Sequence, residues 1–167
     1  MKNKLAYIIL YILLSYSCGK IETYSEIPQI QFKSAVINVE KDELDNSIYQ
    51  LKLTINLIDG DGNFGLTDDE ISDTSLKQQY KYNFFSKLFV IKNKEIKEAT
   101  FYNIPHYNYI IPYIGGSQKQ VIKADIIVNI EYSYFPFDTV FIECKVRDRN
   151  FNESNTVISE PIIIPKK

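Results

Sequence analysis

Apolar and polar residues alternate with a period of two along much of the chain between residues 29 and 164. In the segment 47–59, SIYQLKLTINLID, apolar side chains occupy every second position and most of the intervening residues are polar. Segments 121–132 and 138–148 repeat the pattern. Because successive side chains of a strand point to opposite faces, this alternation predicts strands with one face in a core and the other in water.

Further strands are expected outside these three segments, at 29–38, 87–92, 94–99 and 156–164. Pro161 favours an edge position for the last of them, because proline cannot donate a hydrogen bond to a central ladder. No window has a convincing apolar period of 3.6 residues, and only 68–82 is expected to hold a short helical turn. About seven short strands separated by turns predict an all-β fold, an antiparallel β-sandwich.

The first 17 residues have the layout of an export signal, with two lysines followed by the apolar run Leu5–Leu14. This run is about half of the ~20 residues that a membrane-spanning helix needs. Cys18 ends the segment, which resembles the lipobox of bacterial lipoproteins, although Ser15 stands where leucine is usual. The resemblance implies cleavage before Cys18 and attachment of lipid to it. An ordinary secretory signal with an incidental cysteine is the alternative.

The chain is therefore expected to consist of a signal peptide (1–17), a lipidated tether (18–27) and a β-sandwich domain (28–165). About 150 residues remain after cleavage, which is enough for one domain with a sizeable core. Two or more acyl chains on Cys18 would anchor the protein stably. No aspartate follows the cysteine to resemble an inner-membrane retention signal, so the expected location is the outer membrane.

Composition narrows the classes of partner and cofactor. The net charge of −2 gives no basic field, so nucleic acid is not an expected partner. Cys18 and Cys144 are the two cysteines, which excludes a disulfide framework, and Cys144 is predicted to be a buried thiol on a strand. His106 is the single histidine, so a zinc site is not expected.

The loop 59–70, DGDGNFGLTDDE, holds three of the six glycines and is rich in oxygen ligands. Asp59, Asp61, Asn63 and Glu70 match the first, third, fifth and twelfth positions of an EF-hand calcium loop. Phe64 occupies the sixth position, where such loops need glycine, and strand-like and irregular flanks replace the paired helices. Two interpretations remain: a Ca²⁺ site of another geometry, and a turn whose glycines supply positive φ while Asp and Asn cap the backbone.

A second candidate site is the proline-interrupted segment 101–114, FYNIPHYNYIIPYI, whose tyrosines are Tyr102, Tyr107, Tyr109 and Tyr113. Tyrosine combines a flat apolar face with a polar tip, and binding residues of sandwiches often lie on loops. These tyrosines are therefore candidates for contact with a glycan or a protein. The alternative is that they fill strand faces in a chain without tryptophan.

The closing stretch VRDRNFNESNTVIS, with the Asp-Gly-Asp-Gly turn after an early strand, resembles a group of small Bacteroidota lipoproteins. The stretch from Val146 to Val157 is similar to the last strand–turn–strand of bacterial immunoglobulin-like and fibronectin-like domains. The resemblance implies an immunoglobulin-like β-sandwich, although the core tryptophan of antibody domains is missing. It implies no activity.

These observations favour a noncatalytic, lipid-anchored envelope protein that acts as a binding, adhesion or scaffolding module. Its expected partners are the membrane, through lipid on Cys18, and an envelope protein or glycan. The alternatives are a carbohydrate-binding protein or a calcium-assisted envelope hydrolase. The hydrolase would use Asp61, Asp68, Asp69 or Glu70, but a glycine-rich exposed loop is poorly suited to raise the pKa of a catalytic carboxyl group.

Overall fold

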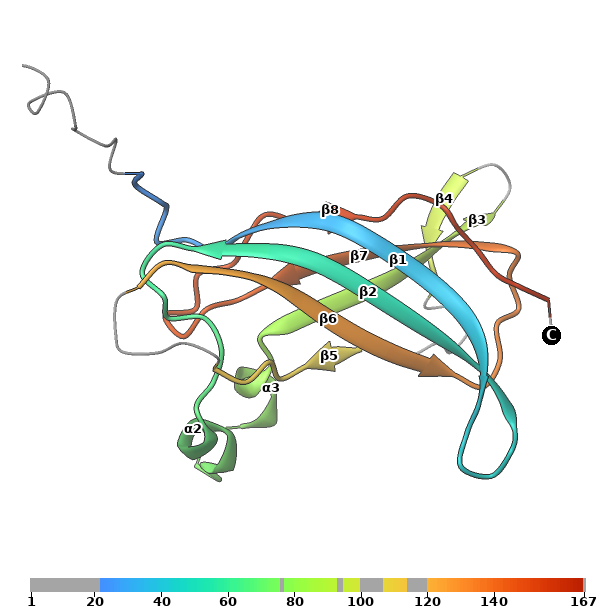
Figure 1. Ribbon diagram of the computed structural model, residues 1–167, viewed down its shortest axis with the longest axis horizontal. Helices are drawn as coiled ribbons and strands as arrows, with labels where there is room; N and C mark the ends of the chain where they lie inside the picture. The colour runs from blue at the N-terminus through green and yellow to red at the C-terminus, as the bar shows by residue number, and fades with distance from the viewer. Residues whose placement is uncertain (1–21, 76, 93–94, 100–106, 114–119, 167) are drawn as a thin grey trace, which may run out of the picture.

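The computed structural model describes residues 22–75, 77–92, 95–99, 107–113 and 120–166, which form two antiparallel sheets packed face to face (Figure 1). The predicted signal peptide and Cys18 lie outside the described residues. The first sheet has the order β1-β2-β6 and contains the longest strands: β1 (Gln29–Lys41), β2 (Ser47–Asp59) and β6 (Ile122–Tyr132). This sheet contributes one wall of the core.

The second sheet has the order β4-β3-β7-β8, and two short strands pair with its inner members. Its strands are β3 (Phe84–Lys92), β4 (Glu95–Glu98), β7 (Thr139–Val146) and β8 (Val157–Ile158), with β5 (Asn108–Tyr109) beside β3 and β9 (Ile162–Ile163) beside β7. The predicted strand 156–164 is thus split around Pro161 into β8 and β9, which both pair with the outer edge of β7. The all-β sandwich predicted from the sequence is confirmed.

The core forms because the apolar sets of the two sheets face each other. Along β2 every second side chain from Leu51 to Leu57 is fully buried, and the set on β6 lies opposite it in register. The second sheet contributes its own buried side chains to the core: Phe84, Leu88, Val90, Val140, Ile142, Cys144 and Val146. Burial of each large apolar side chain contributes about 1.5–3 kcal/mol, so alternation over a few long strands stabilises the sandwich.

Two short helices, α2 (Asp68–Ser72) and α3 (Gln78–Lys81), lie within the segment that was predicted to hold a helical turn. Thr67 begins α2 through a capping box: its side chain accepts from the Glu70 N–H, and the Glu70 carboxylate accepts from the Thr67 N–H. Among the described residues no helix is long and apolar enough to cross a membrane.

The turn after β7 is held by side chains and ties the two sheets together. The Asp148 carboxylate accepts hydrogen bonds from the N–H and the side chain of Asn152, at 2.8 and 2.9 Å. The Asn155 side chain then pairs with the backbone of Ile30 on edge strand β1, as donor and as acceptor, both at 2.8 Å. The stretch VRDRNFNESN therefore links the second sheet to β1 by hydrogen bonds.

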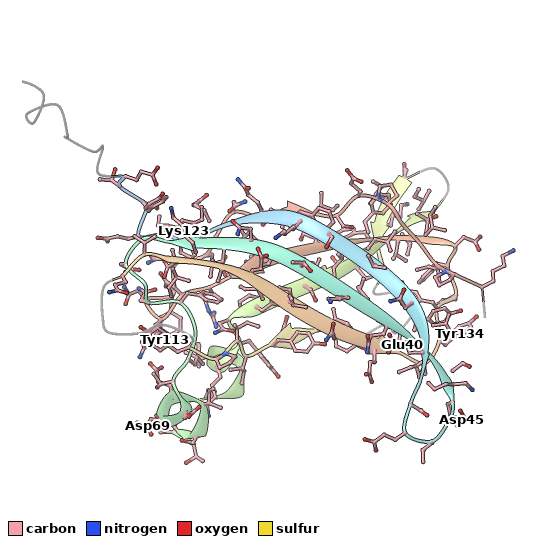
Figure 2. All side chains as sticks on the ribbon, in the orientation of Figure 1. Glu40, Asp45, Asp69, Tyr113, Lys123 and Tyr134 are labelled. Atoms are coloured by element: carbon pink, nitrogen blue, oxygen red, sulfur yellow. The ribbon has the colours of Figure 1, made fainter. Side chains whose placement is uncertain are left out.

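The sandwich has two distinct ends, which Figure 2 marks with labelled side chains. The loop pole carries the turn that follows Asp59, with Lys123, Tyr113 and Asp69 nearby. The hairpin pole carries the turn 42–46 between β1 and β2, with Asp45 and Tyr134. The described N-terminal residues reach the domain at the loop pole (Figure 1).

Candidate functional site

The loop between β2 and α2 is the meeting point of several chain segments, and its glycines lie where they cross. Each glycine faces the backbone of a residue distant in sequence: Gly60 that of Ser25, Gly62 that of Gln120 and Gly65 that of Pro112. A Cβ on Gly62 would overlap the Gln120 carbonyl oxygen, and both Gly62 and Gly65 have positive φ, 69° and 91°. The cluster of glycines is therefore required by close backbone approach as well as by turn geometry.

Three side-chain oxygens in this loop are buried without a hydrogen-bond partner among the described residues: Asp59 Oδ1, Asp61 Oδ1 and Asn63 Oδ1. The second polar atom of each side chain is held. The Phe64 N–H donates to Asp59 Oδ2 at 3.0 Å, and Asn63 Nδ2 donates to Asp61 Oδ2 at 2.7 Å. Buried polar atoms are almost always paired in folded proteins, so three in one loop need a physical explanation.

The electrostatic environment of Asp59 is negative. This residue is fully buried at the end of β2, and burial raises the pKa of its carboxyl group to about 6. The backbone N–H groups of Phe64 and Asn63 oppose the increase, whereas the carboxylates of Asp61 and Asp148 add to it. The sequence placed Asp59 at the exit of a strand, but it gave no sign that the side chain would be buried.

Glu70, the fourth predicted calcium ligand, is engaged elsewhere. Its carboxylate accepts from the Thr67 N–H at 2.8 Å and from Arg149 Nε at 2.9 Å. Burial opposes ionisation of Glu70, but the bonds from Thr67 and Arg149 outweigh it and lower its pKa. The structure thus brings together Asp59, Asp61 and Asn63 in one loop, and holds Glu70 in the capping box of α2.

An open cavity of about 550 Å³ lies over the loop. It is lined by Glu26, Gly60, Asp61, Gly62, Asn63, Tyr113, Arg149 and Asn150. The Arg149 guanidinium lies 5.4 Å from the centre of the Tyr113 ring, in addition to its ion pair with Glu70. The cavity lining therefore combines two carboxylates, those of Glu26 and Asp61, with one arginine and one tyrosine.

Sequence reasoning did not single out Glu26, Arg149 or Asn150, which complete this cavity. Arg149 and Asn150 belong to the stretch VRDRNFNESN, whose pattern indicated a turn but not its neighbours. Glu26 belongs to the predicted tether. Only the fold brings these segments to the loop after β2, because no local pattern encodes a contact over such separations.

The predicted tyrosine site is divided by the fold. Tyr102 lies outside the described residues, as does His106. Tyr107 and Tyr109 stack on each other and pack against the core, where Tyr107 meets Tyr132 with ring centres 5.3 Å apart. Burial raises the pKa of both Tyr107 and Tyr109. Of the four tyrosines, Tyr113 alone lines the cavity among the described residues.

The remaining candidates for catalysis are separated from one another. Asp68 and Asp69 are exposed in the first turn of α2, whereas Asp61 lies in the cavity. Cys144 is buried in β7, and burial raises the pKa of its thiol to about 12, which keeps it in the unreactive neutral form. The described residues contain no group of three or more His, Cys, Asp or Glu side chains placed to hold a metal ion.

Comparisons of the chain with models of protein families, with curated proteins and with solved structures gave no match. No relative therefore supplies a substrate, a partner or a ligand set. Among the described residues, the loop after β2 combines buried unpaired oxygens with an adjoining open cavity.

Proposed function

We propose that the protein is a noncatalytic, lipid-anchored β-sandwich of the outer membrane, which presents a binding or scaffolding surface to an envelope protein or glycan. The strand orders support an immunoglobulin-like domain. If β1, β2 and β6 correspond to strands A, B and E, and β4, β3, β7 and β8 to C′, C, F and G, the two sheets have the immunoglobulin arrangement. The fold by itself implies no activity.

The observation that supports the proposal is that the predicted tether joins the domain at one end, the loop pole. The Gly60 N–H donates to the Ser25 carbonyl oxygen at 2.8 Å, so the predicted tether is fixed to the loop pole close to its last residues. Lys123 at the start of β6 also pairs with Glu22. Cys18 is four residues before Glu22 and can lie at most about 14 Å from it. A lipid on Cys18 would therefore hold the loop pole near the membrane.

The hairpin pole would then face away from the membrane and be free for contacts. It carries two exposed apolar side chains, Leu44 at 81% and Tyr134 at 71% exposure. The hairpin turn is braced by its own side chains, since the Asp42 carboxylate accepts from the N–H groups of Leu44 and Asn46 at 2.9 and 2.8 Å. A braced turn with an exposed apolar side chain, Leu44, is suited to partner contact because less entropy is lost on binding, and Tyr134 after β6 adds a second apolar side chain at the same pole.

The anchoring is tested by Cys18→Ala, with membrane partitioning measured after cell fractionation. Loss of the protein from the membrane fraction is expected, because no acyl chain would then hold it. The control is Cys144→Ala, which removes the other cysteine and should partition as the wild type does. Unchanged partitioning of Cys18→Ala would overturn the proposal.

The binding surface is tested by photo-crosslinking in intact cells from positions 44 and 134. A discrete crosslinked species is expected from both positions, because residue 44 belongs to the turn between β1 and β2 and Tyr134 lies at the same pole (Figure 2), which would face away from the anchor. A crosslinker at Ile127, which is exposed on the outer face of the first sheet, is the matched control. Crosslinks from position 127 alone would place the partner on the sheet face and contradict the proposed surface.

No specific observation on the described residues favours either alternative, the calcium-assisted hydrolase or the carbohydrate-binding protein. Asp59 is the carboxyl group with a raised pKa, but its side chain is fully buried and cannot contact a substrate. A sugar-stacking platform needs several aromatic faces on one surface, whereas Tyr107 and Tyr109 are packed against the core.

A further inference from the structure

We infer that Asp59, Asp61 and Asn63 form a binding site for a divalent cation, Ca²⁺, at the loop pole. The inference does not depend on the lipid anchor or on the partner at the hairpin pole. It rests on three observations: the three unpaired buried oxygens, the way their second atoms are fixed, and the purely oxygen chemistry of the set.

Hydrogen bonds within the loop fix the orientation of the three side chains whose oxygens would bind the ion. Asp59 Oδ2 and Asp61 Oδ2 are each occupied by an N–H donor, which leaves one oxygen of each carboxylate available. Asn63 donates through Nδ2 to Asp61, so its Oδ1 is the atom that remains. All three side chains come from alternate positions of one five-residue stretch, and each offers one oxygen.

A cation accounts for these three acceptors better than a hydrogen-bond donor does. A water molecule can donate hydrogen bonds to such acceptors, but it leaves the negative charge of the adjacent carboxylates of Asp59 and Asp61 in place. Among the described residues, no N–H or O–H group is hydrogen-bonded to any of these three oxygens. A metal ion accepts any number of lone pairs up to its coordination number and also neutralises the adjacent carboxylates.

The donor set selects calcium among common cations. Two carboxylate oxygens and one amide oxygen are hard ligands, without the imidazole or thiolate that zinc and copper favour. Calcium takes six to eight oxygens in a flexible geometry, so water and Glu26, which lines the cavity together with Asp61 and Asn63, are available to complete its shell. Magnesium demands a stricter octahedron, which a short glycine-rich loop is less able to impose.

The arginine that lines the cavity is held by other groups. Arg149 lines the cavity, but its Nε is bound to Glu70 at 2.9 Å and its guanidinium lies over Tyr113. The Glu70 carboxylate therefore serves to hold Arg149 rather than to bind the ion. The proposed site therefore differs from an EF-hand loop, in which Glu70 would be a ligand.

Thermal unfolding of the purified full chain, in chelator and in a CaCl₂ titration, tests the inference. Affinity is expected near the range of extracellular calcium modules, with Kd about 10⁻⁴–10⁻³ M. At a calcium concentration about tenfold above Kd the unfolding equilibrium constant should fall about 11-fold. A parallel titration with Tb³⁺ should show luminescence sensitised by Tyr113, which lines the cavity.

Substitutions at the proposed ligands separate this site from general calcium effects. Asp59→Asn and Asp61→Asn should each weaken calcium binding at least tenfold while the chain still folds, because both conserve shape. Asp69→Asn removes an exposed carboxylate of the same acidic stretch and should leave the response unchanged. Glu70→Gln, which keeps a side chain suited to the capping box, should also leave it unchanged.

Three results would overturn the inference. The first is the absence of any calcium-dependent change in wild-type unfolding up to about 10 mM, well above the weakest expected Kd. The second is loss of the response in Glu70→Gln but not in Asp61→Asn. The third is an equal response to MgCl₂, which would remove the assignment of calcium. Membrane partitioning is measured separately, so failure here is distinguishable from failure of the lipid anchor.

Discussion

At the scale of single residues, Asp59 is the most unusual side chain of the described chain. Its position at the end of β2, before a glycine-rich turn, suggests a solvated residue, but its carboxyl group is fully buried beside other acidic groups. A carboxyl whose pKa is higher in the folded than in the unfolded state favours folding while it is protonated. That preference is lost as the pH rises, which gives a measurable signature.

In the presence of chelator, the stability of Asp59→Asn relative to the wild type should depend on pH. The folded pKa of about 6 lies above the unfolded value near 3.9, so the wild type loses stability as the pH rises between these values. From pH 4 to pH 7 the difference in unfolding free energy should shift in favour of Asp59→Asn by about 2 kcal/mol. Urea unfolding at both pH values measures it, with Asp68→Asn as an exposed control. A difference that does not change with pH would contradict a raised pKa.

At the scale of elements, the loop after β2 depends on close contact between backbones. Gly62 is buried with φ of 69°, and its α-carbon faces the Gln120 carbonyl just before β6. A side chain at this position conflicts both with the backbone conformation and with the neighbouring segment.

Gly62→Ala should therefore destabilise the protein by about 1–3 kcal/mol, since a methyl group must displace the Gln120 segment. Thermal or urea unfolding measures the effect. Asn150→Ala, at an exposed position that lines the same cavity, should change stability by no more than about 0.5 kcal/mol. Equal stability of Gly62→Ala and wild type would show that the loop can move away from residue 120.

The turn after β7 acts as a second element that joins distant strands. The Asn155 side chain makes the hydrogen bonds that a neighbouring strand would make with Ile30, since it accepts from the Ile30 N–H and donates to the Ile30 carbonyl oxygen. Exposed edge strands offer unpaired backbone groups, and this side chain covers two of them on β1.

Asn155→Ala should lower the free energy of unfolding by about 1–2 kcal/mol, since two hydrogen bonds of about 1 kcal/mol each are lost. Asn155→Asp gives a sharper comparison, because it keeps the acceptor for the Ile30 N–H and loses the donor to the carbonyl. Its cost should be intermediate between those of the wild type and Asn155→Ala. Thr156→Ala at the adjacent exposed position is the control, and an effect of the same size there would contradict a specific role for Asn155.

At the scale of the whole molecule, the folded unit begins before the first strand. The predicted tether spans residues 18–27, but its described part packs at the loop pole through Ser25 and lines the cavity with Glu26. Residues 22–28 thus contribute to the domain, and they fix which pole is nearest the anchor.

A chain that begins at Pro28 should be less stable than one that begins at Glu22, by about 1–2 kcal/mol, because the Gly60 N–H loses its partner and the loop loses its cover. Urea unfolding of the two chains measures the difference. The chain from Glu22 should match one that begins at Gly19. Equal stability of all three would mean that residues 22–27 act only as a spacer.

The sequence by itself determined the elements, because alternation is a local property of each strand and needs no knowledge of its partners. The strands along 47–59 and 121–132, the burial of Cys144 and the edge position of the segment around Pro161 all follow from residues close in sequence. The capping box at Thr67 is equally local, although the sequence alone did not reveal that it would commit Glu70 to helix α2.

Only the tertiary structure decided what these elements do together. The burial of Asp59, the contact of its loop with residues 25, 112 and 120, and the capture of Glu70 by Arg149 join segments far apart in the chain. Likewise Tyr107 and Tyr109 are core-packing residues only because β3 and β6 lie beside them. Such contacts depend on which strands pack against each other, and the free energy that fixes this packing is spread over the whole core rather than over any short stretch.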